Sequence, residues 1–144
     1  MASILVIDDD QAVLATIDLV LARDAHTVVV TDDGRKGLEL FKTGAFDLLI
    51  VDIFMPAMDG LETMSLARRY RPEVPVLVIS GNMVRSGADS MPDFLRMATR
   101  LGAVSSLQKP FRPSELLAAV DNCLSRPDGV LPRPVAAENN FSTD

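Results

Sequence analysis

The sequence predicts an α/β protein built on a doubly wound parallel sheet, and two observations support this fold class. Short runs of Val, Ile and Leu alternate along the chain with segments whose apolar residues recur at helical spacing. The runs predict strands buried on both faces, as in a parallel sheet, and the periodic segments predict amphipathic helices. Strict alternation of the two implies helices on both faces of the sheet, joined by right-handed crossovers.

Three of the predicted strands lie in the first part of the chain. Residues 4–7 and 26–31 are short runs rich in β-branched residues, and residues 47–52 form a more apolar run that ends at Asp52. A predicted helix follows each of the first two runs, and its apolar residues recur at helical spacing: Val13, Ile17 and Leu21 in the first, Leu38 and Phe41 in the second. Gly44 is expected to stop the second helix.

The rest of the chain continues the same alternation. In order, it predicts a helix, a strand, a loop with a helix, a strand and a last helix, at residues 60–71, 74–79, 83–100, 104–108 and 113–124. The segment before Arg100 is the least regular, because Ser, Gly and Pro interrupt its helical period. Pro113 or Ser114 is a suitable first residue for the last helix.

One domain accounts for the chain. Its 144 residues, 48% of them hydrophobic, suffice for a single core, which we assign to residues 1–125. Residues 126–144 are rich in Pro and polar residues and show no strand or helix period, so they predict a disordered tail.

Charge and composition exclude several functions. The net charge of -6 opposes binding to nucleic acid or to an anionic membrane. Cys123 is the only cysteine, which rules out an intramolecular disulfide and fits a reducing compartment. The chain starts without a basic leader and holds no apolar run of roughly 20 residues, the length that spans a bilayer. We therefore expect a soluble, cytoplasmic protein.

Polar residues follow four of the predicted strands. Asp8 and Asp9 come after the first strand, Asp52 ends the third, Ser80 follows the fourth and Lys109 follows the fifth. If these four strands are neighbours, their carboxyl ends bring the five side chains to one edge of the sheet, where ligands bind in open α/β folds.

Each of these groups has a distinct chemical use at such an edge. Three carboxylates that meet repel one another unless a cation offsets their charge, and oxygen ligands of this kind suit Mg²⁺. A carboxylate such as Asp52 can also attack phosphorus and form an aspartyl-phosphate. Lys109 and the Ser80 hydroxyl would then stabilise the phosphoryl oxygens. Asp10, in contrast, is expected to serve as the N-cap of the first helix.

These residues lie in four motifs by which the sequence resembles the receiver domain of two-component response regulators, in particular the chemotaxis-type, single-domain regulators. The motifs are Ile-Asp-Asp, Asp-Ile-Phe-Met-Pro-Ala-Met-Asp-Gly, Ile-Ser-Gly and Lys-Pro-Phe, and the resemblance runs from Ile4 to about Leu124. Each motif is weak alone, whereas four in the right order, each at a strand end, are specific. The resemblance implies a flavodoxin-like sheet of five strands in the order 2-1-3-4-5 with five helices.

The resemblance implies that the protein is a phosphorylation-dependent signalling switch. Asp52 would accept a phosphoryl group from a histidine kinase or a histidine phosphotransfer protein, and Ser80 and Lys109 would hold that group. The chain would catalyse its own phosphorylation and dephosphorylation without being an enzyme for another substrate. It would signal to a downstream protein, as a monomer or weak dimer, and the Lys109-Pro110 peptide bond is expected to be cis.

The resemblance also implies a metal site. Asp9 and Asp52 would bind Mg²⁺ directly, the Phe54 backbone carbonyl would be the third protein ligand, and Asp8 would act through water.

Three features depart from the family pattern. Ser106 stands where the family usually has an aromatic residue, so the signal must leave the site by a different route. The interval from Ser80 to Gly102 is longer than usual by about seven residues, which places an insertion before the fourth helix. Phe54 lies two positions after the phosphoacceptor, where its side chain would hinder water, so we expect slow loss of the phosphoryl group.

Two other functions remain open on the sequence alone. The loss of the aromatic at Ser106 favours a receiver-like interaction module that works without phosphorylation, although the intact Asp, Ser and Lys set disfavours it. A small phosphohydrolase with an aspartate nucleophile is the second alternative. Such enzymes place a second acid two residues after the nucleophile, and Phe54 occupies that position here.

Overall fold

The described part of the protein, residues 2–53, 60–81, 100 and 102–125 of a computed structural model, contains one parallel sheet. Its strands run in the order β2-β1-β3-β4-β5, which confirms the predicted flavodoxin-like arrangement. The strands are β1 Ser3–Ile7, β2 Thr27–Thr31, β3 Leu48–Asp52, β4 Val76–Ser80 and β5 Ser105–Gln108.

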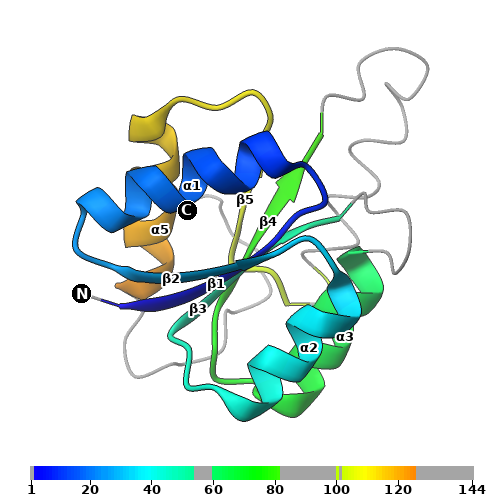
Figure 1. Cartoon of the computed structure of the whole chain (residues 1–144). Coiled ribbons are helices and arrows are strands. Elements are labelled where there is room, and N and C mark those ends of the chain that lie inside the picture. Colours follow the sequence, from blue (N-terminus) through cyan, green and yellow to red (C-terminus); the bar gives the residue numbers. More distant parts are fainter. Residues whose placement is uncertain (1, 54–59, 82–99, 101, 126–144) are drawn as a thin grey trace.

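Helices cover both faces of the sheet. They are α1 Gln11–Arg23, α2 Gly34–Thr43, α3 Gly60–Tyr70 and α5 Pro113–Leu124. The first and last of these lie on one face, and α2 and α3 lie side by side on the other (Figure 1). The predicted fourth helix falls almost entirely outside the described residues, as do the insertion before it and the tail.

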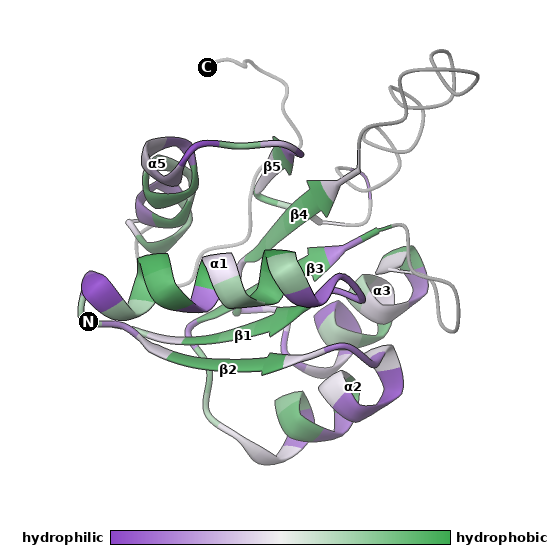
Figure 2. Ribbon diagram, turned by 45° about the horizontal axis from the view of Figure 1, so that its top comes forward, coloured by the Kyte–Doolittle hydropathy of each residue, from purple (hydrophilic) through white to green (hydrophobic). Residues whose placement is uncertain are grey.

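The core consists of two apolar layers that the sheet separates. Leu5 and Ile7 of β1 belong to the layer under α2 and α3, whereas Ile4 and Val6 belong to the layer under α1 and α5. This alternation is the two-residue period of a strand buried on both faces. Figure 2 shows the result, with hydrophobic strands at the centre and the hydrophilic residues of α2 and α3 toward the outside. The central strands β1, β3 and β4 are packed on both faces, so their carboxyl ends are held in fixed positions.

Local capping fixes where the helices begin and end. The Asp10 side chain accepts hydrogen bonds from the amides of Ala12 and Val13, which confirms its predicted role as the N-cap of α1. Gly44 is the C-cap of α2, and α5 begins at Pro113, both as predicted.

Four strands start later than the sequence predicts, β4 by two residues and β2, β3 and β5 by one residue each. β2 begins at Thr27 because the His26 amide donates to the Leu21 carbonyl at the end of α1. β4 begins at Val76 because the amide of Val74 is held in a turn by the carbonyl of Arg71.

The turn after α1 gives a stability prediction. Ala25 has a φ of 67°, a left-handed conformation, and the flanking bonds from His26 to Leu21 and from Ala25 to Ala22 form a Schellman motif. A Cβ at this position costs roughly 1–2 kcal/mol relative to glycine. Ala25→Gly is expected to raise the free energy of unfolding by about 1 kcal/mol, measured by urea titration. Ala22→Gly, inside the same helix, should lower it, and the opposite order would contradict this account.

Candidate functional site

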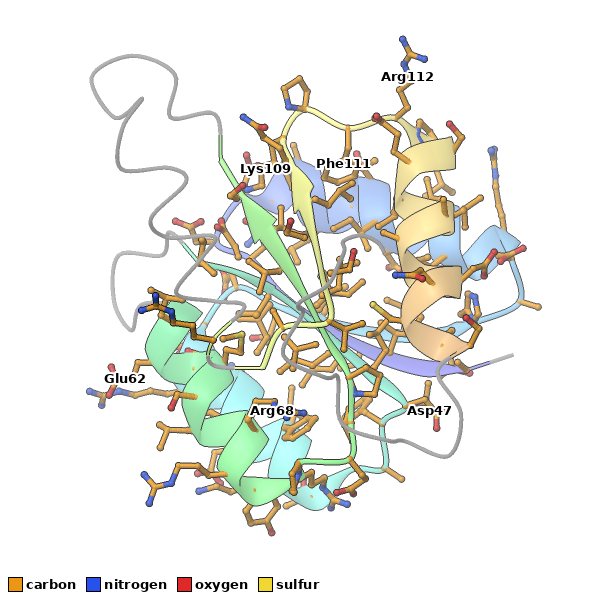
Figure 3. All side chains as sticks on the ribbon, turned by 180° about the vertical axis from the view of Figure 1, so that it is seen from behind. Asp47, Glu62, Arg68, Lys109, Phe111 and Arg112 are labelled. Carbon is orange, nitrogen blue, oxygen red and sulfur yellow. The ribbon has the colours of Figure 1, made fainter. Side chains whose placement is uncertain are left out.

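The carboxyl ends of four adjacent strands carry the predicted site residues. Asp8 directly follows β1, Asp52 and Ser80 are the last residues of β3 and β4, and Lys109 directly follows β5. Because these strands are neighbours in the sheet, their ends meet at one edge. Lys109 lies at the arrowhead ends of β4 and β5 in Figure 3.

Three carboxylates form a close group at this edge. One oxygen from each of Asp8, Asp9 and Asp52 lies within 4.8 Å of the others. The first and last of these side chains are buried, and Asp9 is exposed to solvent. The amide of Asp10 donates to Asp8 Oδ1 at 2.9 Å, which orients that carboxylate and turns Oδ2 toward the lysine.

Lys109 joins the two buried carboxylates. Its Nζ lies 2.9 Å from Asp8 Oδ2 and 3.1 Å from Asp52 Oδ2, and the Lys109 side chain is only 17% exposed. Burial lowers the pKa of Lys109, but the hydrogen bond to Asp8 and the charges of both carboxylates outweigh it and leave that pKa raised above 10.5. The backbone also helps to place this lysine, because its amide donates to the Ser80 carbonyl at 2.8 Å. The Lys109-Pro110 bond is cis, as predicted.

The charges of this group do not balance. With all four groups ionised, three carboxylates and one ammonium carry a formal charge of -2. One divalent cation would neutralise that charge, and carboxylate oxygens next to solvent are the ligands that Mg²⁺ prefers. The residues present therefore fit a magnesium ion.

Ser80 contributes a hydroxyl without an assigned partner. The residue is fully buried, and among the described residues its Oγ has no hydrogen-bond partner. The pairing of Asp52 with Ile79 in the β3–β4 register places Ser80 beside the end of β3. A buried hydroxyl rarely goes unbonded, so this one is available to an oxygen that enters the site.

Two contacts at the site were not predicted from the sequence. The Asp10 amide that orients Asp8 is one, since the sequence shows only an N-cap there. The other is Gly60, where a Cβ would overlap the carbonyl oxygen of Asp52 and the Cα of Ile53. Glycine at the first residue of α3, soon after the apolar strand, is the signal that would have indicated this close approach.

Of the two single-residue departures from the family pattern, Ser106 is described by the structure and Phe54 is not. Ser106 is exposed on β5, opposite Val78 of β4, so the edge strand presents a small polar side chain at the position of the usual aromatic. Phe54 lies outside the described residues, so its carbonyl ligand and its effect on water stay predictions.

The fold and this edge together define a class of flavodoxin-like domains with an acidic, lysine-paired site at the carboxyl ends of the strands. Within that class, residues 4–121 match the response regulator receiver domain, and the chain belongs to this family. It is therefore a receiver domain of the two-component response regulators, a class that works by phosphorylation-dependent signalling.

Known proteins of this family resemble the chain over most of its length. The chemotaxis protein CheY4 of Vibrio cholerae superposes with a TM-score of 0.76 at 27% identity, covering 86% of this chain and 99% of that one. NtrX from Brucella abortus gives a TM-score of 0.75 at 26% identity, covering 85% of this chain and 27% of that protein. The cell cycle response regulator CtrA of Brucella ovis is 30% identical over 126 residues. That match covers 88% of this chain and 51% of the relative, so the chain spans about half the length of the curated relatives it matches.

The described helices also bear on membrane insertion. None of them is long and apolar enough to cross a bilayer.

Proposed function

We propose that this protein accepts a phosphoryl group on Asp52 from a histidine kinase or a histidine phosphotransfer protein and signals through protein contacts. The observation that carries the proposal is the pairing of Lys109 Nζ with both Asp8 and Asp52 inside a three-carboxylate group. In the transfer, an Asp52 carboxylate oxygen attacks phosphorus as the phosphorus–nitrogen bond of the donor histidine breaks. The histidine nitrogen keeps the electron pair of that bond, and an acyl phosphate forms on Asp52.

The other residues divide the remaining tasks. Asp9, Asp52 and the Phe54 carbonyl would hold Mg²⁺ directly and Asp8 would hold it through water. When bound, the ion would offset the charge of the phosphoryl oxygens. Lys109 places an ammonium beside the attacked carboxylate, at a distance from which it can pair with a phosphoryl oxygen.

Ser80 donates a hydrogen bond to the same phosphoryl group in this proposal. Its buried hydroxyl, without a partner among the described residues, supports that role. The chain thus catalyses its own phosphorylation and dephosphorylation.

The proposal includes an organisation for the whole chain. Residues 1–125 form the receiver domain, and residues 126–144 form a tail outside it. The domain acts in the cytoplasm, as a monomer or weak dimer, and its output is a contact with a downstream protein whose affinity depends on the modification.

Phosphorylation by a small donor tests the central step. Incubation with acetyl phosphate and Mg²⁺ is expected to add one phosphoryl group, seen as a gain in intact mass. The same incubation with EDTA should give little gain, because the charge of the carboxylate group then stays unbalanced. An unchanged mass with Mg²⁺ present would rule out the proposed chemistry.

The second candidate is an interaction module that does not depend on phosphorylation, and the exposed Ser106 in place of an aromatic favours it. Pull-down of cellular partners with unmodified protein and with acetyl phosphate-treated protein separates the two. The switch predicts partners that differ between the samples, whereas the module predicts the same partners in both.

A further inference from the structure

A cluster of basic and aromatic side chains lies at the last turns of α2 and α3. Tyr70, the only tyrosine of the chain, is 51% exposed. The Lys42 ammonium lies 5.8 Å and the Arg71 guanidinium 5.5 Å from the centroid of its ring. Arg69 is an exposed neighbour on the same turn. We call Lys42, Arg69, Tyr70 and Arg71 the Tyr70 cluster.

The cluster is held in place by contacts between the two helices. Arg71 Nη2 donates to the Lys42 carbonyl at 3.2 Å, and the Tyr70 hydroxyl lies 3.5 Å from the same oxygen. These bonds use the backbone at the end of α2, so the cationic group of Lys42 itself remains exposed. An aromatic side chain that already contacts two cations loses little conformational freedom when a partner binds.

The face that carries the cluster differs in charge from the rest of the protein. Residues 34–43 and 60–73, which include α2 and α3, hold six Arg or Lys and three Glu, a net charge of +3. The whole chain carries -6, so the remainder carries -9. A basic face on an acidic protein attracts an acidic partner. It also orients that partner, because the net negative charge of the remaining surface repels it.

The cluster is also remote from Asp52. Gly60, the first residue of α3, touches the Asp52 carbonyl, and Tyr70 is the last residue of this 11-residue helix. A helix of that length extends about 16 Å. Figure 3 shows Arg68, on the same turn as Arg69, toward the end of the molecule opposite Lys109. A partner can therefore occupy the cluster while the carboxyl edge of the sheet stays accessible.

We propose that the Tyr70 cluster is a docking surface for an acidic segment of a partner protein. Tyr and Arg are the residue types that dominate binding energy at protein interfaces, and here they are adjacent and exposed. Leu66, one turn before Tyr70 on α3 and 36% exposed, extends the surface with an apolar side chain. The inference does not depend on Asp52 accepting a phosphoryl group.

A protein segment fits this surface better than nucleic acid does. A duplex is a long line of phosphates that would also lie near the acidic remainder of the chain, whose charge is -9. A short acidic segment contacts only the basic end of α2 and α3 and avoids that repulsion.

Binding of a fluorescein-labelled oligoglutamate peptide tests the proposal by fluorescence anisotropy. Arg69→Glu is expected to weaken binding about tenfold, because it reverses a charge inside the cluster. Arg23→Glu is the matched control, since it reverses an exposed arginine in the last turn of α1 and changes the net charge equally. It should change the affinity less than about twofold. Tyr70→Ala should weaken binding more than Tyr70→Phe, because both cations lie against the ring, which phenylalanine keeps.

Three results would overturn the proposal. The wild type could fail to bind the peptide, or the two arginine variants could weaken binding equally, which would show attraction by overall charge alone. Tighter binding of a labelled DNA duplex than of the peptide would assign the surface to nucleic acid instead. Thermal unfolding of both arginine variants shows that each is folded before its affinity is compared.

Discussion

Asp52→Asn is expected to abolish the gain of a phosphoryl group from acetyl phosphate in the presence of Mg²⁺. An amide oxygen is not a nucleophile toward phosphorus, and the substitution changes the shape of the side chain very little. Intact mass measures the effect directly. Asp47→Asn is the matched control, because Asp47 precedes β3 at its other end and its side chain accepts a hydrogen bond from the Ser3 amide. An amide oxygen can accept the same bond.

Asp52→Asn should also be more stable than the wild type when no divalent cation is present. Among the described residues, Asp52 lies near two other carboxylates and one ammonium, so within this group its neutralisation relieves two repulsions and loses one attraction. We expect the free energy of unfolding in EDTA to rise by about 1 kcal/mol, as is common when a functional charge is removed. For the first measurement, a mass gain of Asp52→Asn equal to that of the wild type would place the modification on another residue. A loss of stability would show that the carboxylates are not in mutual repulsion.

Lys109→Met is expected to have opposite effects on metal binding and on phosphorylation. Removing the ammonium changes the formal charge of the site from -2 to -3, so Mg²⁺ should bind more tightly. Phosphorylation by acetyl phosphate should nevertheless slow by about 100-fold, because a fixed positive charge at the reacting oxygens is lost. Calorimetric titration with Mg²⁺ and the rate of mass gain measure the two effects. Lys36→Met, at an exposed lysine, should change neither, and a parallel fall in both quantities would contradict the assigned role.

The difference in stability between the wild type and Lys109→Met should depend on pH in a defined direction. The folded protein holds the pKa of Lys109 above 10.5, so the ion pairs contribute fully below that pH and are lost as the pH rises through the higher folded value. Wild type should exceed Lys109→Met by about 2 kcal/mol in free energy of unfolding at neutral pH. Urea titrations should show that this difference is constant up to about pH 10 and smaller above it. A difference that grows above pH 10 would have the wrong sign.

The sequence predicts the structure best where a local pattern decides it. The apolar run before Asp52 indicates a doubly buried strand, and the residues after each strand indicate which side chains reach the same edge. The order of the strands did not follow from periodicity, because the crossover between β1 and β3 leaves no local signal. It came from the resemblance to receiver domains and was then confirmed. The starts of β2 and β4 were displaced by main-chain bonds of the preceding turns.

Features that depend on distant residues were not predictable in this way. The contact of Lys109 with Asp8 joins residues from the ends of two strands that are not neighbours in the sheet. The sequence predicts that both side chains lie at one edge of the sheet, but not how far apart they lie. The Tyr70 cluster likewise needs Lys42 from α2 beside Tyr70 from α3, and only the packing of these helices brings them together.

The junction between β3 and α3 also limits how far this protein can be redesigned. At Gly60 the helix meets the main chain of Asp52 and Ile53 with no room for even the methyl group of alanine. A crowded side chain can rotate to another rotamer, whereas the main chain at the end of a buried strand has no such freedom. Any larger residue must therefore push apart β3 and α3, which meet at Asp52 and Ile53. Engineering of new specificities into this scaffold should leave position 60 as glycine and place its changes on the outer turns of the helices.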